Sequence, residues 1–455
     1  MWFLLGILFL GNGIVFLIRE IRFIIKQKDI IIISYMRLLF SLTYGFIPSI
    51  MCFLYVLDGT EIKLQTLVKV SYSSVGLSNL YFFWMLSIFA YIFLCVGYSK
   101  NIKIKRIKPK KHMELSQLQI SFVAFTTLII GFISLYLWTK TEGSIFNFIL
   151  KANWYRGDYT NSLHNSYAMF RQPAKLVTIS ALIFFFQLIN QKEKHKIIYF
   201  VGYLLSLVAS ILYLLCTDGR LQIAMFFGIQ LIGFFLYRKG DTKLTKKQIA
   251  LVGILGVAAL LLITRLNDIT SLIRFGHTYY SNEENNAFQT LMNEFGYVYE
   301  SAQMSIEKTI FQGGHLFIFD DIVRGVFSIL PSRFTPEGFE LVWRYNTFVC
   351  TGSKLAGTIP CDLVSQSVYD LHIVGVAVIP LFWGFLARKV EDYYADKKSN
   401  SFNRAMYMGM VLIFFRIVNY CALYDCMRGF FAYLITFLLA YIVYKGAIAL
   451  SGLRK

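Results

Sequence analysis

Several arginines of this chain lie in or beside long apolar segments. Arg220 lies in a short turn between two apolar runs, Arg416 lies within a third run, and Arg428 begins the last one. Placing a charge at the centre of a membrane helix costs about 2.5–3.5 kcal/mol on insertion scales, so charges kept there usually have a function or a partner. Because a guanidinium group holds phosphate oxygens in two-point contacts, these arginines predict an anionic, phosphate-like ligand.

Each of these positions also has a structural interpretation. Arg220 follows Asp218 closely and can pair with it, and Arg416 can pair with an acidic residue of another helix. Whether Arg416 binds a ligand or pairs with an acidic residue, it must face a cavity or a partner rather than lipid. Arg37, near the inner end of its apolar run, is expected only to extend its side chain to the lipid headgroups.

Further cations occur beside aromatic residues in the segments between apolar runs. Arg156 lies in WYRGDY and Arg171 lies in FRQP. Aromatic faces stack on sugar rings and guanidinium groups hold phosphate, so both arginines are expected to contact a substrate. The segment 265–370 adds five arginines, of which about half are expected to be ordinary solvated charges. They are Arg265, Arg274, Arg324, Arg333 and Arg344.

A general base is expected in the same long segment. His315, in GGHLF, is the best-placed neutral base, although a lone histidine is more often structural than catalytic. Glu337 in TPEG and Asp362 in IPCD are carboxylate alternatives. The adjacent Asp320 and Asp321 lack a third ligand, so the sequence predicts no metal site.

The seven cysteines are scattered and show neither a CxxC motif nor the spacing of zinc ligands. Cys350 and Cys361 can form a disulfide if their side of the membrane is an oxidising periplasm. Two unrelated free thiols are the alternative, and the sequence leaves both open.

All these residues belong to a strongly apolar chain of 455 residues, of which 56% are hydrophobic, 17% aromatic and 16% charged. The mean hydropathy is +0.56. Repeated apolar runs have about the 20 residues that cross a bilayer as a helix, which indicates an all-α polytopic membrane protein. This composition excludes a soluble multidomain enzyme, a disordered regulator and a secreted disulfide scaffold. The runs are continuous rather than alternating, which also excludes an outer-membrane barrel.

Hydropathy predicts about eleven membrane spans. They lie near residues 2–18, 30–57, 78–98, 117–139, 174–190, 197–216, 221–237, 249–264, 371–387, 405–422 and 429–446. The chain therefore divides into an N-terminal bundle of eight spans (1–264), a long outer segment (265–370) and a C-terminal group of three spans (371–455). A second outer segment, 140–175, interrupts the first bundle.

The distribution of charge predicts the orientation of these spans. With the N-terminus outside and the C-terminus inside, the inner segments hold 27 lysines and arginines against eight acidic residues, and the outer segments hold 16 against 18. This excess of inner cations is what the positive-inside rule requires. The basic run 100–111 is then expected to bind anionic lipid headgroups rather than nucleic acid.

The outer segment 265–370 contains two regions with a predicted structure. Residues 286–310 have helical apolar spacing, and residues 316–330 form a strongly apolar stretch that ends before Pro331. The second stretch is expected to lie on the membrane surface or to dip into it. No nucleotide-binding motif is visible, and no inner portion is large enough to hold such a site, so no cofactor is expected.

Three stretches of sequence carry a family resemblance: TDGR at 217–220, IVRGVFSILPSRFTP at 322–336, and GTIPCDLVSQSVYDLHIVGV at 357–376. They resemble the O-antigen polymerase family, the Wzy-type enzymes that include the enterobacterial common antigen polymerase. The first is similar to the family's Gly/Ser-Arg hairpin between spans. The second is similar to a stretch of that polymerase that ends in a proline-containing turn. The resemblance extends over most of the chain.

The resemblance implies an enzyme of the bacterial inner membrane that polymerises oligosaccharide repeat units carried on undecaprenyl pyrophosphate. The reaction would take place at the periplasmic face, release undecaprenyl pyrophosphate and build the O-antigen of lipopolysaccharide or another surface polysaccharide. The family further implies a membrane glycosyltransferase fold of the C type, no required metal, and a separate chain-length regulator as a further partner.

The resemblance also implies roles for individual residues. It carries over to Arg220, Arg324 and Arg333 as contacts to the lipid pyrophosphate or the glycan. Related ligases use a histidine of a periplasmic loop, which His315 matches by its location. Many members have an acidic residue, usually glutamate, where Asp362 stands.

Two other functions remain open, a flippase for lipid-linked oligosaccharides and the ligase that transfers finished glycan to lipid A core. A flippase has little use for a long outer segment, and transporters tend to have repeated halves, which this sequence lacks. A purely structural membrane protein would leave the cost of Arg220 and Arg416 unexplained.

Overall fold

The computed structural model describes most of the chain, and every structural statement below concerns the described residues. They are residues 1–27, 30–58, 73–99, 115–152, 165, 167–190, 196–217, 220–237, 251, 254, 272, 287–318, 320–327, 334, 340–353, 359–394, 400–421 and 423–452. Within these ranges the structure consists of helices and their connections and contains no strand. The predicted all-α fold class is therefore confirmed.

Nine described helical segments are long and apolar enough to cross a membrane. Five of them are formed by α1 (Trp2–Gln27), by α2 (Ile32–Ser41) with η1 (Leu42–Phe46) and α3 (Ile47–Asp58), by α4 (Ser74–Tyr98), by α5 (Gln117–Thr139), and by α10 (Leu176–Ile189) with the short helical turns directly before it, from Ala168. The other four are formed by α11 (Lys196–Cys216), α17 (Leu363–Tyr394), α18 (Ser401–Asn419) and α19 (Leu423–Gly452). All nine correspond to predicted spans. The predicted span 221–237 is the shorter apolar helix α12 (Arg220–Tyr237), and 249–264 lies outside the described residues.

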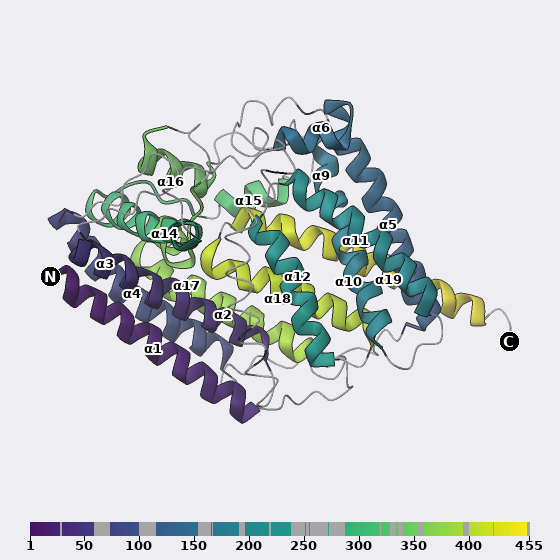
Figure 1. Cartoon of the computed structure of the whole chain (residues 1–455), viewed down its shortest axis with the longest axis horizontal. Helices are drawn as coiled ribbons and strands as arrows, with labels where there is room; N and C mark the ends of the chain where they lie inside the picture. Colours follow the sequence, from purple (N-terminus) through teal and green to yellow (C-terminus); the bar gives the residue numbers. More distant parts are fainter. Residues whose placement is uncertain are drawn as a thin grey trace.

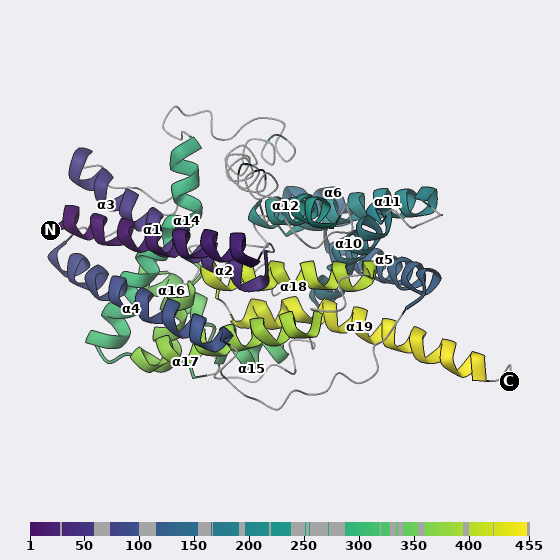
Figure 2. The ribbon, with the colours of Figure 1, turned by 90° about the horizontal axis from the view of Figure 1, so that it is seen from below.

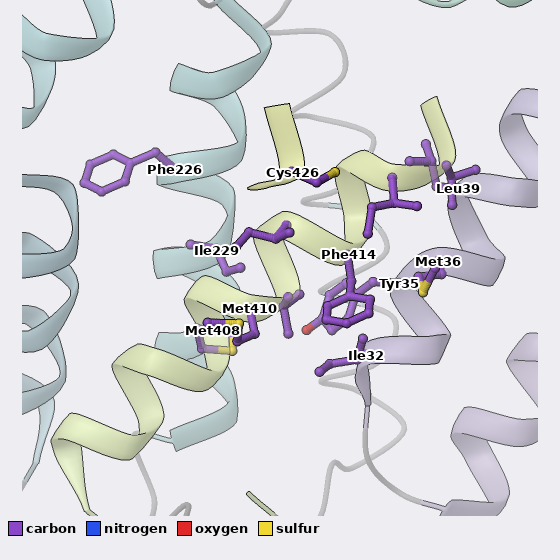
Figure 3. Close-up of a cluster of buried hydrophobic side chains, with 14 of the residues drawn as sticks. Ile32, Tyr35, Met36, Leu39, Phe226, Ile229, Met408, Met410, Phe414 and Cys426 are labelled. Carbon is purple, nitrogen blue, oxygen red and sulfur yellow. The ribbon is translucent and has the colours of Figure 1, made fainter. Parts of the chain in front are cut away.

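The helices form two groups that are joined by α18. Figure 2 shows α1, α3 and α4 at one end of the molecule and α5, α10 and α11 at the other. Figure 3 shows α18 between side chains of α2 and of α12, with Met408 and Phe414 of α18 lying among residues from these helices. Most of α18 is buried, including Met408 and Phe414. Thus α18 is the central helix of the bundle.

The shorter helices lie along one side of the bundle. They include α6 (Ile145–Leu150) and α9 (Arg171–Ala174) of the segment 140–175, and α14 (Ala287–Ser305), η4 (Ile306–Phe311), α15 (Asp320–Phe327) and α16 (Val342–Thr351) of the segment 265–370. In Figure 1 the labelled helices of both segments follow the upper edge of the molecule. The described helices of both segments therefore lie on one side of the bundle, and the side of the membrane on which they lie remains a prediction.

The helix predicted over 286–310 is present as α14, which continues into the π-helix η4. Four of its apolar positions, Met292, Phe295, Val298 and Tyr299, are buried. The predicted stretch 316–330 contains α15, whose Gly325 approaches α19 so closely that an added Cβ would lie 2.8 Å from the Cβ of Met427. Its location at the membrane surface remains a prediction.

A break in α17 separates two helices with different surroundings. Leu371 and His372 are not helical, and His372 has φ 58° and ψ −151°, a conformation that only glycine adopts readily. All eight residues before the break, Leu363–Asp370, are buried. The predicted span near 371–387 therefore begins where the structure breaks, after a short buried helix.

The structure corrects the expectation for Arg37. Its side chain does not extend to the headgroups: Arg37 is buried, and its Nη1 lies 3.3 Å from Oε2 of the buried Glu20 in α1. The guanidinium carbon also lies 5.4 Å from the ring centroid of Phe23. Because α1 and α2 are neighbours that pack together, the counter-charge comes from the preceding helix rather than from lipid.

Replacing Glu20 with glutamine is expected to lower the free energy of unfolding by about 3 kcal/mol, because it leaves the buried charge of Arg37 without its counter-charge. Denaturant unfolding of the detergent-purified protein measures the change. The matched control is Glu142→Gln, which removes a partly exposed pair with Lys151 (2.6 Å) and should cost less than about 1 kcal/mol. Equal costs for the two variants would contradict the structural role of the buried pair.

Candidate functional site

Five helices meet around a hollow at their ends on the side of the short helices. α10, α12 and α19 begin there, and α11 and α18 end there. The hollow has a cavity volume of about 70 Å³ and is partly open to the exterior. The lining residues share no single segment of sequence, and they include Lys175, Thr178, Leu182, Tyr213, Leu214, Gln222, Met225, Phe226, Leu412, Ile413, Arg416, Tyr420, Cys426, Gly429 and Tyr433. We call this site the cationic hollow.

The polarity of the cationic hollow changes along the helices that form it. Lys175 directly precedes α10, whereas Leu182 lies about two turns further along that helix. On α18, Arg416 lies in the last turn and Leu412 lies about one turn deeper. The hollow is thus cationic near the helix ends and apolar further in, which suits a ligand with an anionic head and an apolar tail.

Arg416 lines this hollow, so it faces a cavity as its cost in lipid requires. Its guanidinium carbon lies 5.9 Å from the ring centroid of Tyr420, a cation–π contact. In the described part of the chain no carboxylate forms an ion pair with Arg416. Arg416 therefore supplies a positive charge that no described acidic residue neutralises.

Lys175 is the second cation of the hollow and was not singled out from the sequence. Its Nζ lies 5.7 Å from the ring centroid of Tyr433 in α19. The available signal was its position, directly before the apolar helix α10 and two residues after Pro173, where a cation borders the hydrocarbon core. Lys175 and Arg416 come from segments more than 200 residues apart, so only the fold brings them together.

Four further predicted arginines lie on elements next to the cationic hollow. Arg171 is the first residue of α9, the short helix that ends directly before Lys175. Its guanidinium carbon lies 5.7 Å from the ring centroid of Trp138. Arg324 is in α15, which packs against the beginning of α19. Arg220 begins α12, and Arg428 lies near the beginning of α19.

The remaining predicted residues are not among the described residues that line the hollow. Arg156, Arg333 and Glu337 are outside the described residues. His315 is exposed between η4 and α15 and is not among the residues that line the hollow. Its ring lies edge-on to that of Phe317, with the two ring centroids 4.9 Å apart. A base at His315 would therefore have to act from outside this cavity.

Asp362 is fully buried and serves as a cap at the beginning of α17. Its Oδ1 accepts hydrogen bonds from the hydroxyl of Tyr44 (2.7 Å) and from the backbone N–H groups of Val364 (2.9 Å) and Ser365 (3.1 Å), and the Ser365 hydroxyl donates to Oδ2. Burial raises the pKa of Asp362, and these hydrogen bonds oppose the increase. This bonding explains the buried carboxylate structurally, as a helix N-cap.

The described residues form neither a metal-binding cluster nor a disulfide. No group of three or more His, Cys, Asp or Glu side chains there is arranged to hold a metal ion. The seven cysteines are free thiols in this structure, so of the two alternatives for Cys350 and Cys361 the structure has the free thiols.

Glu300 of α14 is an ionisable residue that the sequence did not indicate. It is 1% exposed, and neither carboxylate oxygen has a hydrogen-bond partner in the part of the chain that the structure describes. Burial raises the pKa of Glu300 to about 8. The apolar spacing of the helix gave no signal for it, because Glu300 adjoins the apolar positions without belonging to them.

These features define a helical protein of the multi-pass membrane type with a cavity suited to an anionic, partly apolar ligand. Comparison with known proteins adds no relative: the chain matches no protein-family model, no curated protein and no solved structure.

Proposed function

We propose that the protein polymerises oligosaccharide repeat units carried on undecaprenyl pyrophosphate at the periplasmic face of the bacterial inner membrane. The observation that carries the proposal is the cationic hollow, in which Lys175 and Arg416 lie at the helix ends and apolar side chains lie deeper. A polyprenyl pyrophosphate has the matching chemistry, because its anionic head is joined directly to an apolar chain. The resemblance of the sequence to O-antigen polymerases supplies the reaction.

In the proposed reaction, a hydroxyl group of the incoming repeat unit attacks C1 of the reducing-end sugar of the growing chain. The bond between C1 and the pyrophosphate oxygen breaks, and undecaprenyl pyrophosphate leaves with the bonding electrons. A base accepts the proton of the attacking hydroxyl. Lys175 and Arg416 would stabilise the charge that develops on the departing pyrophosphate, which is the largest electrostatic demand of such a transfer.

The base of this reaction is assigned by elimination among the predicted residues. Asp362 is occupied by the bonds of a helix cap, and Glu337 lies outside the described residues. His315 is exposed on the side of the short helices and is the first residue to test as the base. An acidic group for the leaving oxygen is not required, because pyrophosphate is already a good leaving group.

Transport is the second candidate function, and one observation favours it: none of the predicted bases is among the described residues that line the cationic hollow. A flippase needs a cationic cavity for the lipid headgroup but no base. Ligation of finished glycan to lipid A core is the third candidate, and it uses the same lipid-linked donor.

Deletion of the gene, followed by gel analysis of the surface glycan, separates the three functions. We expect single repeat units on lipid A core, because a strain without the polymerase can still flip and ligate one unit. Loss of these single units as well would indicate a flippase. Full-length glycan stranded on undecaprenyl pyrophosphate would indicate the ligase, and either result would contradict the proposed polymerase.

A further inference from the structure

The end of α18 carries both the cation and one aromatic wall of the cationic hollow. Arg416 lies in the last turn, and Tyr420 follows the helix directly. The N–H of Tyr420 donates to the carbonyl oxygen of Arg416 (2.7 Å), and the Tyr420 ring lies beside the guanidinium group. The position at which α18 ends therefore sets where both side chains point.

Tyrosines from two other segments bind the carbonyl groups at this helix end. The last carbonyl groups of an α-helix have no partner within the helix and need donors from elsewhere. The hydroxyl of Tyr297, in α14, donates to the carbonyl oxygen of Asn419 (2.5 Å). The hydroxyl of Tyr44, in η1, shares its single proton between the carboxylate of Asp362 (2.7 Å) and the carbonyl oxygen of Val418 (3.1 Å). The end of α18 is thus fixed by side chains that lie outside the hollow.

Tyr297 also contacts the wall of the hollow directly. Its ring centroid lies 5.3 Å from that of Tyr420, with the two ring planes inclined by 40°. Burial, and then the neighbouring Tyr420, hold the pKa of Tyr297 well above its ordinary value, so the hydroxyl remains a hydrogen-bond donor. Tyr297 does not itself line the hollow, and it acts on the site through the end of α18 and through the ring of Tyr420.

We infer that Tyr297 is a positioning residue of the cationic hollow, through which the long segment 265–370 orients Tyr420 and Arg416 for an anionic ligand. The inference rests on the proposed function, since it takes the ligand to be a polyprenyl pyrophosphate. It assigns a specific task to α14: this helix holds the end of α18 in the conformation that presents the guanidinium group to the hollow.

The test compares the binding of farnesyl pyrophosphate and of farnesol to the full-length protein in nanodiscs. Tyr297→Phe keeps the ring and removes the hydroxyl. We expect roughly three- to tenfold weaker binding of farnesyl pyrophosphate, the effect of one hydrogen bond that positions a charge. Binding of farnesol should be unchanged, because farnesol lacks the pyrophosphate that Arg416 would contact.

A double-mutant cycle distinguishes positioning from a general structural effect. If Tyr297 acts through Arg416, Tyr297→Phe should have no further effect on farnesyl pyrophosphate binding in an Arg416→Gln background. The matched control is Tyr407→Phe, which removes a buried hydroxyl bonded to Glu391 (2.7 Å) from the same helix α18. Tyr407 does not line the hollow and lies more than one turn before Leu412, the first residue of α18 that does. This control should leave the preference for farnesyl pyrophosphate over farnesol as in the wild type.

The outcomes separate this inference from the proposed function. If the wild type does not prefer farnesyl pyrophosphate to farnesol, the proposed lipid-pyrophosphate site and the inference both fall. Two results would overturn only the inference, provided that the wild type prefers farnesyl pyrophosphate. In the first, Tyr297→Phe binds farnesyl pyrophosphate as tightly as the wild type does. In the second, Tyr297→Phe weakens the binding of farnesol as much as that of farnesyl pyrophosphate. Should Tyr297→Phe not fold, Tyr420→Leu tests the same arrangement, because it removes the ring beside Arg416 and should also reduce the preference.

Discussion

Replacing Arg416 with glutamine is expected to lower the rate of polymerisation about a hundredfold, the effect of removing one preorganised group that stabilises developing charge. Arg416 lines the cationic hollow and has no described carboxylate partner, so its charge is available to a ligand rather than to the fold. Glutamine keeps a polar side chain of similar reach but has no charge. The rate is measured as glycan chain growth in membranes from a deletion strain that expresses the variant.

The matched control for this experiment is Arg388→Gln. Arg388 of α17 also lies on a membrane helix, but it pairs with Asp392 (2.6 Å) and does not line the hollow. We expect glycan chains of normal length from this variant. Normal chains from Arg416→Gln at wild-type expression would contradict the role of the cationic hollow in the proposed reaction.

The sequence was sufficient to predict the long helices, because an apolar run of membrane-spanning length is a local signal, but it predicted neither α16 nor the buried first part of α17. Apolar runs of membrane-spanning length became nine long helices, and the apolar spacing of 286–310 became α14 and η4. The predicted number of spans, about eleven, includes the span 249–264, which lies outside the described residues. Side chains that meet across helices were harder to predict: Arg37 was assigned to the headgroups, whereas the structure pairs it with Glu20 of the preceding helix.

The candidate site was predicted in part, and the physical reason lies in the origin of its residues. Arg416 could be identified from its own segment, because a charge within an apolar span costs free energy and is therefore conspicuous in the local sequence. Lys175 lies at the end of a span, where a cation costs little free energy, so nothing in the sequence indicated a ligand contact there. Only the fold places Lys175 in the same hollow as Arg416. The tyrosines that fix the end of α18 come from η1 and α14, and no local pattern connects these three segments.

The buried carboxyl group of Glu300 is expected to make stability depend on pH. Its pKa of about 8 in the folded protein exceeds that of an exposed glutamate, about 4.3, because burial without a hydrogen-bond partner disfavours the charged form. The folded state therefore holds this proton more tightly than the unfolded state. The resulting stabilisation is complete below about pH 4 and is lost as the pH rises toward 8.

Replacing Glu300 with glutamine removes this dependence, because glutamine resembles the protonated acid and cannot ionise. We expect the variant to be more stable than the wild type at pH 8.5, by as much as about 5 kcal/mol, with a much smaller difference near pH 5. Denaturant unfolding in detergent at the two pH values measures both differences. The matched control is Glu307→Gln in η4, whose carboxylate accepts hydrogen bonds from Asn79 (3.1 Å) and Gln312 (2.9 Å). This control should retain the wild-type change between the two pH values, and an equal pH response of Glu300→Gln and the wild type would show that Glu300 is not the group responsible.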